Sequence, residues 1–184
     1  MRPVITAIYL MLLLIVGGIM VPDYADAASA KELNRDAQKA LNVLFAKSDK
    51  AQELAKEAKA VLIFPAITKA GFLVGGEYGE GVLLRNGKPG GYYNTVAVSY
   101  GFQIGAQKYG YALFFMSDAA LKYLDKSDGW ELGSAPSIVL IDTGASGGIS
   151  TTSAQSDMYA FFFGQMGLMA GLGLQGTKIT KIEK

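Results

Sequence analysis

The stretch SIVLIDTGASGG, residues 137–148, contains residues whose types and order could do chemistry. Four apolar residues lead into Asp142, Thr143 and Gly144, an order typical of the catalytic turn of small aspartic proteases. Such an enzyme needs two facing carboxylates that share one proton. A homodimer could supply the second aspartate, but no stretch with the pattern of the protease flap follows Asp142. We therefore interpret the stretch as a strand that ends in a turn, where the carboxylate accepts hydrogen bonds from backbone N–H groups.

The chain contains no histidine and no cysteine, which leaves few catalytic groups. A Ser–His triad, a thiol nucleophile and a zinc site of the usual nitrogen or sulfur type are excluded. Two carboxylates, Glu77 and Glu80, lie in a glycine-rich stretch that continues into the strand-like sequence VLLR, whereas a phosphate-binding loop would open a helix. We interpret them as solvated charges at a strand edge. The sequence predicts a protein that is not an enzyme and has no cofactor or metal site.

The first thirty residues indicate export. Arg2 precedes an almost wholly apolar run over residues 4–20, and small residues then supply cleavage sites after Ala27 or Ala30. The run is short for a membrane span. We therefore predict a signal peptide over residues 1–30 and a periplasmic or secreted protein. The net charge of +1 gives no strongly basic footprint, so nucleic acid is not an expected partner.

Residues 31–59 have the pattern of amphipathic helices. They contain no glycine or proline, and apolar residues such as Leu33, Ala37 and Leu41 recur at three- and four-residue steps. Ser48 could cap a second helix, so one continuous helix and two helices, over 31–47 and 49–59, both fit the pattern. The apolar stripe is expected to pack on the rest of the domain.

Strands are predicted from residue 60 onward, where most of the 23 glycines occur. The first apolar run, AVLIFP, is closed by Pro65. Side chains alternate in character from Tyr92 to Ala106, which predicts one long strand, and Asn-Gly and Pro-Gly pairs within 85–91 predict a hairpin before it. Further strands are expected at 109–116, 137–141, 158–163 and 168–175, with a short helix capped by Ser117 and Asp118.

These patterns predict an α+β fold in a single domain over residues 31–184, helical over 31–59 and mainly β over 60–184. Long alternating strands with glycines at the bends are typical of a strongly curved antiparallel β-sheet or a small β-barrel. The N-terminal amphipathic helices are then expected outside the sheet or across one of its ends.

Three segments resemble one known family. They are AKAVLIFPAITKAGFLVGGEYGEGVLL, SYGFQIGAQ and YAFFFGQMGLMAGLGLQGTKITKI, at residues 58–84, 99–107 and 159–182. In this order they look like the SYLF domain, also called the Ysc84 or Las17-binding protein family, and the chain is similar to a stand-alone, exported bacterial member. The resemblance implies phospholipid binding. In eukaryotic members it implies phosphoinositide ligands, often with an SH3 domain and actin-related partners.

The combined prediction is an exported, non-catalytic lipid-binding module that recognises phospholipid or an anionic membrane surface. The candidate lipid contacts are Lys59, Lys69, Arg85 and Lys88 around the helix exit and the first hairpin, with Tyr92 and Tyr93 in the interfacial zone. Lys178, Lys181 and Lys184 could also meet headgroups. An integral outer-membrane β-barrel and a structural envelope protein are the alternatives, and a protease that uses Asp142 is a remote one.

Overall fold

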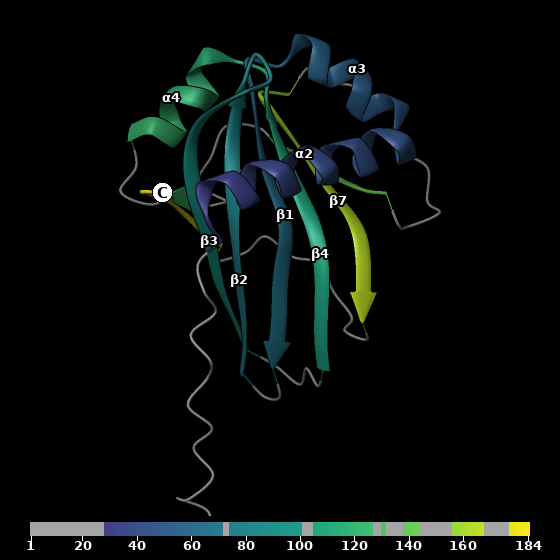
Figure 1. The fold of residues 1–184 in the computed structure, drawn as a ribbon, viewed down its shortest axis with the longest axis vertical. Helices are drawn as coiled ribbons and strands as arrows, with labels where there is room; N and C mark the ends of the chain where they lie inside the picture. Colours follow the sequence, from purple (N-terminus) through teal and green to yellow (C-terminus); the bar gives the residue numbers. More distant parts are fainter. Residues whose placement is uncertain are drawn as a thin grey trace, which may run out of the picture.

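The computed structural model describes residues 28–71, 74–100, 105–126, 130–131, 138–143, 156–167 and 177–184. It is an α+β structure in which two helices precede a sheet, as predicted. Figure 1 shows α2 lying across the strands near one end of the sheet, while β1, β2 and β4 continue well beyond it. None of the helices that the structure describes is long and apolar enough to cross a bilayer.

The N-terminal region forms two helices, α2 (Ala30–Lys47) and α3 (Asp49–Glu57), which decides between the two arrangements that the pattern allowed. Ser29 begins α2 through a capping box, in which its hydroxyl accepts from the Glu32 backbone N–H and the Glu32 carboxylate accepts from the Ser29 backbone N–H. Ser48 ends the first helix and caps the second, because its hydroxyl accepts from the backbone N–H of Ala51.

In the described residues the sheet has eight strands, which in space follow the order β5-β8-β3-β2-β1-β4-β7-β6. The strands are β1 (Ala60–Gly71), β2 (Val74–Arg85), β3 (Lys88–Tyr100), β4 (Gly105–Phe115), β5 (Trp130–Glu131), β6 (Ile138–Asp142), β7 (Met158–Gly167) and β8 (Lys178–Ile182). A third helix, α4 (Asp118–Lys126), follows β4, and the Ser117 hydroxyl caps it by accepting from the Ala120 backbone N–H. This helix and its cap agree with the sequence prediction.

The sheet is open, so the barrel prediction is wrong. Within the described residues the two edge strands, β5 and β6, do not pair with each other. All pairs are antiparallel except that of β6 with β7, so the sheet is mixed rather than wholly antiparallel. The physical reason is that both faces are covered: consecutive residues Leu62 and Ile63 are each fully buried, one in each of two separate core clusters. A small barrel would bury only its inner face.

Two details of the strand prediction also need correction. The alternation from Tyr92 to Ala106 is not one strand, because β3 ends at Tyr100 and Gly105 begins β4, which pairs with β1 on the far side of β2. Pro65 does not close the first strand. β1 continues to Gly71 through a bulge at residues 64–66, which tolerates the missing N–H of a proline.

The predicted hairpin is confirmed. Asn86 and Gly87 link β2 to β3 with φ values of 51° and 73°, the left-handed backbone of a two-residue turn. The strands expected at 109–116, 137–141 and 158–163 are present as β4, β6 and β7. The strand expected at 168–175 and the proposed signal peptide, residues 1–27 of it, lie outside the described residues.

We call the two sides of the sheet the α2 face and the α4 face, after the helices that pack on them. The α2 face buries Ile63, Phe114 and Phe161 against α2 and α3. The α4 face buries Phe64, Tyr111, Phe162 and the apolar side of α4, including Leu121. Stacked rings add to this second cluster: the centroids of Tyr111 and Phe162 are 5.0 Å apart. The core therefore lies at the helical end of the sheet, and the far end of the α2 face extends past the helices.

Candidate functional site

The far end of the α2 face carries large apolar side chains that are exposed in the part of the chain that the structure describes. Tyr78 is 49% exposed, Val96 is 42% exposed and Val98 is 52% exposed. Tyr78 and Val96 are direct partners across β2 and β3, and Val98 follows two residues later on the same face. Met166 on β7 is 68% exposed. We call these four residues the apolar sheet face; grouped exposure of this kind marks interaction sites.

The pairing register places these residues in one row across the sheet. Reading from β7 to β8, the successive Cα partners are Met166, Lys108, Thr68, Tyr78, Val96 and Lys178. The next row consists of small residues, Ala106, Ala70 and Gly76, followed by Val98. Tyr78, Val96 and Val98 therefore form an apolar group with small residues beside Tyr78.

The charges around the apolar sheet face are mainly positive. Lys108 and Lys178 are exposed and stand at either side of Tyr78 and Val96 in the row. The negative charge of the nearby Glu80 carboxylate is balanced by an ion pair, in which the Nζ atom of Lys184 lies 2.8 Å from Oε2 of Glu80. Tyr78 donates a hydrogen bond to the other oxygen of Glu80 at 2.9 Å. Burial, followed by this bond, raises the pKa of Tyr78, so the phenol stays neutral.

The six predicted lipid contacts do not form one surface. Lys59 and Lys88 are exposed, while Arg85 forms a salt bridge of 3.1 Å with Asp125 of α4. Tyr92 accepts a hydrogen bond from the Asn34 amide on the α2 side. Tyr93 is only 2% exposed and belongs to the core cluster of the α4 face. A lipid contact remains a prediction for these residues.

Lys69, the last of the six, is buried on the α4 face. Its Nζ atom lies 3.0 Å from Oε1 of Glu77, and the hydroxyl of Tyr109 donates to Oε2 of Glu77 at 2.6 Å. Burial, and then this hydrogen bond, raises the pKa of the Tyr109 phenol far above its usual range. Glu77 is thus not a solvated edge charge, and Glu80 is mostly buried by its pairing with Lys184. The cluster is a satisfied interior ion pair.

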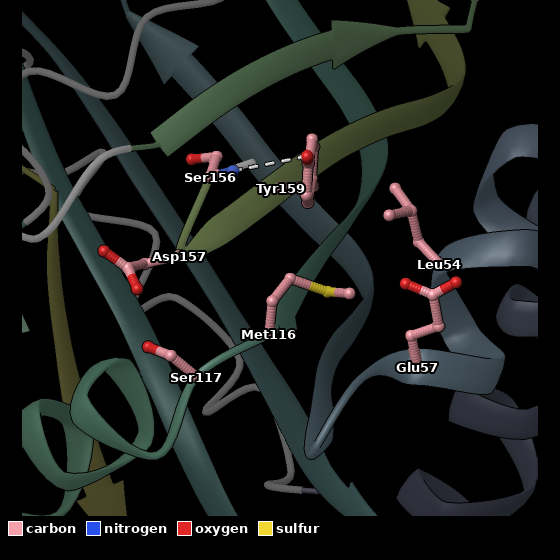
Figure 2. Close-up of a pocket in the computed structure, with 7 residues that line it drawn as sticks. All are labelled: Leu54, Glu57, Met116, Ser117, Ser156, Asp157 and Tyr159. Atoms are coloured by element: carbon pink, nitrogen blue, oxygen red, sulfur yellow. Dashed lines mark hydrogen bonds between the residues drawn. The ribbon is translucent and has the colours of Figure 1, made fainter. Parts of the chain in front are cut away.

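A pocket of about 410 Å³ lies where α3, the start of α4 and the start of β7 meet. Figure 2 shows its seven lining residues, Leu54, Glu57, Met116, Ser117, Ser156, Asp157 and Tyr159. The carboxylates of Glu57 and Asp157 come from opposite sides, with Met116 between them. Within the described residues, no three acidic side chains are close enough together to hold a metal ion. The lining residues that the structure describes therefore place these two carboxylates on opposite walls of the pocket rather than side by side.

The IDTG stretch forms an ordinary strand end. β6 ends at Asp142, and the backbone N–H and the hydroxyl of Thr143 both donate to the Phe162 carbonyl at 3.0 Å. These bonds hold the end of β6 on β7. The side chain of Asp142 and residues 144–150 lie outside the described part of the chain, so the expected hydrogen bonds to the carboxylate remain a prediction.

Sequence reasoning missed the apolar sheet face. The alternation of Tyr92, Asn94, Val96 and Val98 was visible, but it did not show that this side of β3 extends past the helices. The position of α2 on the sheet decides that, and it depends on tertiary packing. Tyr78 lies in the glycine-rich stretch in which only the carboxylates Glu77 and Glu80 were considered as candidate site residues.

Comparison with known proteins gives one family. Residues 96–184 match the model of the Ysc84 family, described as Las17-binding protein actin regulators. No curated protein matches the chain. The matched region begins in β3 at Val96 and includes every later strand and α4. The resemblance carried by SYGFQIGAQ and YAFFFGQMGLMAGLGLQGTKITKI is therefore confirmed, because both segments lie within the residues that match the Ysc84, or SYLF, domain.

Proposed function

We propose that this protein is a non-catalytic module that binds anionic phospholipid membranes through its apolar sheet face. The observation that carries the proposal is the exposed row in which Tyr78 and Val96 lie between Lys108 and Lys178. An apolar surface with basic residues at its sides fits the boundary between acyl chains and anionic headgroups. The resemblance to the SYLF domain implies phospholipid ligands, which likewise combine acyl chains with a charged headgroup.

The forces involved favour reversible binding at the membrane surface. Each lysine near an anionic leaflet contributes about 1 kcal/mol, and burial of apolar side chains adds about 25 cal/mol for each Å² removed from water. The lysine contribution is screened by salt over about 10 Å at 0.1 M ionic strength. Binding should therefore need both the apolar residues and the lysines, and it should weaken as salt is added.

We also propose that the protein is exported and acts in the periplasm or outside the cell. Of the two predicted cleavage sites, the one after Ala27 is supported by the helix that follows. Cleavage after Ala30 would remove Ser29 and with it the capping box of α2. Cleavage after Ala27 keeps that box and also keeps the Ala28 carbonyl, which accepts a hydrogen bond from Lys184. Sequencing the N-terminus of the exported protein tests this, and a first residue of Lys31 would contradict it.

Vesicle binding tests the membrane proposal. Vesicles of phosphatidylcholine with phosphatidylglycerol should bind the protein more tightly than vesicles of phosphatidylcholine alone. The key variant is Val98→Asp, which places a charge on the apolar sheet face and should greatly reduce binding. Leu140→Asp is the matched control, because Leu140 is 53% exposed on the edge strand β6, away from this face. Equal effects of the two substitutions, or equal binding to both kinds of vesicle, would contradict the proposal.

The lysines have their own test. Lys108→Gln combined with Lys178→Gln should weaken binding to the anionic vesicles and flatten its salt dependence. Lys122→Gln removes an equivalent exposed charge from α4, on the other face, and should have little effect. A larger effect of the α4 substitution would place the binding surface on the α4 face and would contradict the proposal.

A further inference from the structure

An apolar cleft of about 180 Å³ opens next to the apolar sheet face, between α2 and the sheet. Its walls include Val43 of α2, Ala66 of β1 and Phe163 of β7. Met166 and Lys108 also line it, and both belong to the row of residues that crosses the sheet. Among the lining residues that the structure describes, Lys108 is the one with a charge, and no described side chain forms a salt bridge with it.

The cleft lies where β1 and β7, the two strands that flank β4, are both irregular at the same level. β1 has one extra residue in its bulge near Pro65 and Ala66. β7 has one extra residue between the pair Lys108–Met166 and the pair Gly110–Phe163, and Gly164 in this segment adopts a φ of +64°. Both bulges interrupt the sheet beside α2, so the side chains there do not fill the space. Val43, 45% exposed, and Met166, 68% exposed, leave the opening apolar.

We propose that this cleft takes the end of one acyl chain of a membrane phospholipid, while the rest of the lipid stays in the bilayer against the apolar sheet face. This inference rests on the proposed membrane binding and names the lipid part that the site holds. Lys108 lies at the cleft and on the face together, so its ammonium can meet the anionic phosphodiester of that lipid or of its neighbour.

The size of the cleft favours part of a chain over a whole lipid. A dry apolar cavity of about 150 Å³ holds one benzene molecule. The cleft therefore has room for about six carbon atoms of a chain, far less than a complete long-chain lipid. A fully extracted fatty acid would leave most of its length in water, whereas a phospholipid in a membrane keeps the remaining carbons covered.

The decisive variant pair lies on one strand. Ala66 and Ala70 are both exposed residues of β1, but only Ala66 lines the cleft. Ala66→Leu adds three carbon atoms inside the cleft, and Ala70→Leu adds the same atoms outside it. Because both residues are exposed, both variants should fold, which their circular dichroism and thermal midpoints check.

The ligand in the experiment is dihexanoyl-phosphatidylglycerol below its micelle concentration, added to the full chain labelled at its methionine methyl groups. The Met166 signal, assigned with Met166→Leu, should shift and saturate with this lipid and should not shift with glycerophosphoglycerol, which lacks the chains. Ala66→Leu should abolish the shift, and Ala70→Leu should keep it. A shift with the deacylated headgroup, or one that survives Ala66→Leu, would overturn the inference.

The outcomes separate this inference from the proposed function. If Val98→Asp reduces vesicle binding but the Met166 signal does not respond to the short-chain lipid, membrane binding through the apolar sheet face is supported and the acyl-chain inference is rejected. If Val98→Asp has no effect on vesicle binding, the proposed function itself fails. Saturation of Met166 by hexanoate as strongly as by the phospholipid would also reject the membrane lipid as the ligand.

Discussion

The Nζ atom of Lys69 lies 3.0 Å from Oε1 of Glu77, in a part of the α4 face where both side chains are less than 10% exposed. The two residues are direct partners across β1 and β2, and Tyr109 of β4 donates to the same carboxylate. A buried ion pair is costly to desolvate, but breaking it is costlier, because one charge then stays buried without its partner.

Glu77→Gln should therefore lower the free energy of unfolding by about 3–5 kcal/mol, measured by urea denaturation. The double variant Lys69→Met with Glu77→Leu should cost much less than the sum of the two single substitutions. Glu53→Gln is the control, since its ion pair with Lys50 is exposed and contributes less than about 1 kcal/mol. Additive effects of the Lys69 and Glu77 substitutions would show that the pair is not coupled.

Two neighbouring tyrosines on β4 should respond differently to loss of the hydroxyl. Tyr109 is 4% exposed and donates to Glu77, so Tyr109→Phe should cost about 1.5–3 kcal/mol. The buried hydroxyl of Tyr111 has no hydrogen-bond partner in the described part of the chain. Tyr111→Phe should therefore leave stability unchanged or raise it slightly. The reverse order of the two unfolding free energies would contradict the hydrogen-bond arrangement.

The same two phenols predict alkaline behaviour. Burial raises the pKa of Tyr109 and of Tyr111 well above the usual value, and the Glu77 carboxylate adds to the effect on Tyr109. The folded protein thus keeps protons that the unfolded chain releases near pH 10. The stabilising contribution is complete below about pH 10 and is lost as the pH rises further.

Phenolate absorbance and circular dichroism, followed together from pH 9 upward, measure this loss. The phenolate absorbance of Tyr109 and Tyr111 should appear only as the protein unfolds. In Tyr111→Phe this part of the absorbance increase should be smaller. Ionisation of all tyrosines while the circular dichroism stays native would show that these phenols are accessible to base.

Two glycines of β2 give a matched test of close packing. A Cβ atom at Gly81 would lie 2.6 Å from Cδ1 of Phe64 and 2.7 Å from the carbonyl oxygen of Ile63, whereas a Cβ at Gly76 would meet nothing within 4 Å. Gly81→Ala should therefore destabilise the protein by about 1–3 kcal/mol. Gly76→Ala should be neutral or stabilising by up to about 1 kcal/mol. Thermal unfolding of both variants decides, and similar melting temperatures would refute the packing at Gly81.

The features set by local chemistry were predictable from the sequence. Ser48 caps its own neighbours, and Asn86 with Gly87 forms a turn without help from distant residues. Long-range pairing was not predictable. Period-two alternation is the same within one strand and across a break, so it did not reveal that β3 ends at Tyr100 and that β4 begins on the far side of β1 and β2. The closed barrel failed for a similar reason, because apolar alternation does not show that helices cover both faces.

For the candidate site, too, the residue types could be read from the sequence, whereas the exposure of their side chains depends on long-range pairing. The lysines and aromatic residues were predicted as lipid contacts by their type, but which side chains are exposed depends on the pairing register. Lys69 is buried because it is opposite Glu77, and Lys108 is exposed because it is opposite Met166 on the other face. Neither fact is written in the neighbouring sequence. The match of residues 96–184 to the Ysc84 family needed no such geometry, since contiguous motifs carried it.

The most direct test of membrane binding measures the emission and quenching of an environment-sensitive fluorophore attached to the cysteine of the Val98→Cys variant. The chain has no other cysteine, so the label occupies one site, and Lys122→Cys on α4 provides the same label on the other face. With vesicles that contain phosphatidylglycerol, the label at residue 98 should shift to the blue and be quenched by lipids with spin labels on their chains. The label at residue 122 should stay in water. Quenching at residue 122 but not at residue 98, with the protein bound, would contradict the account.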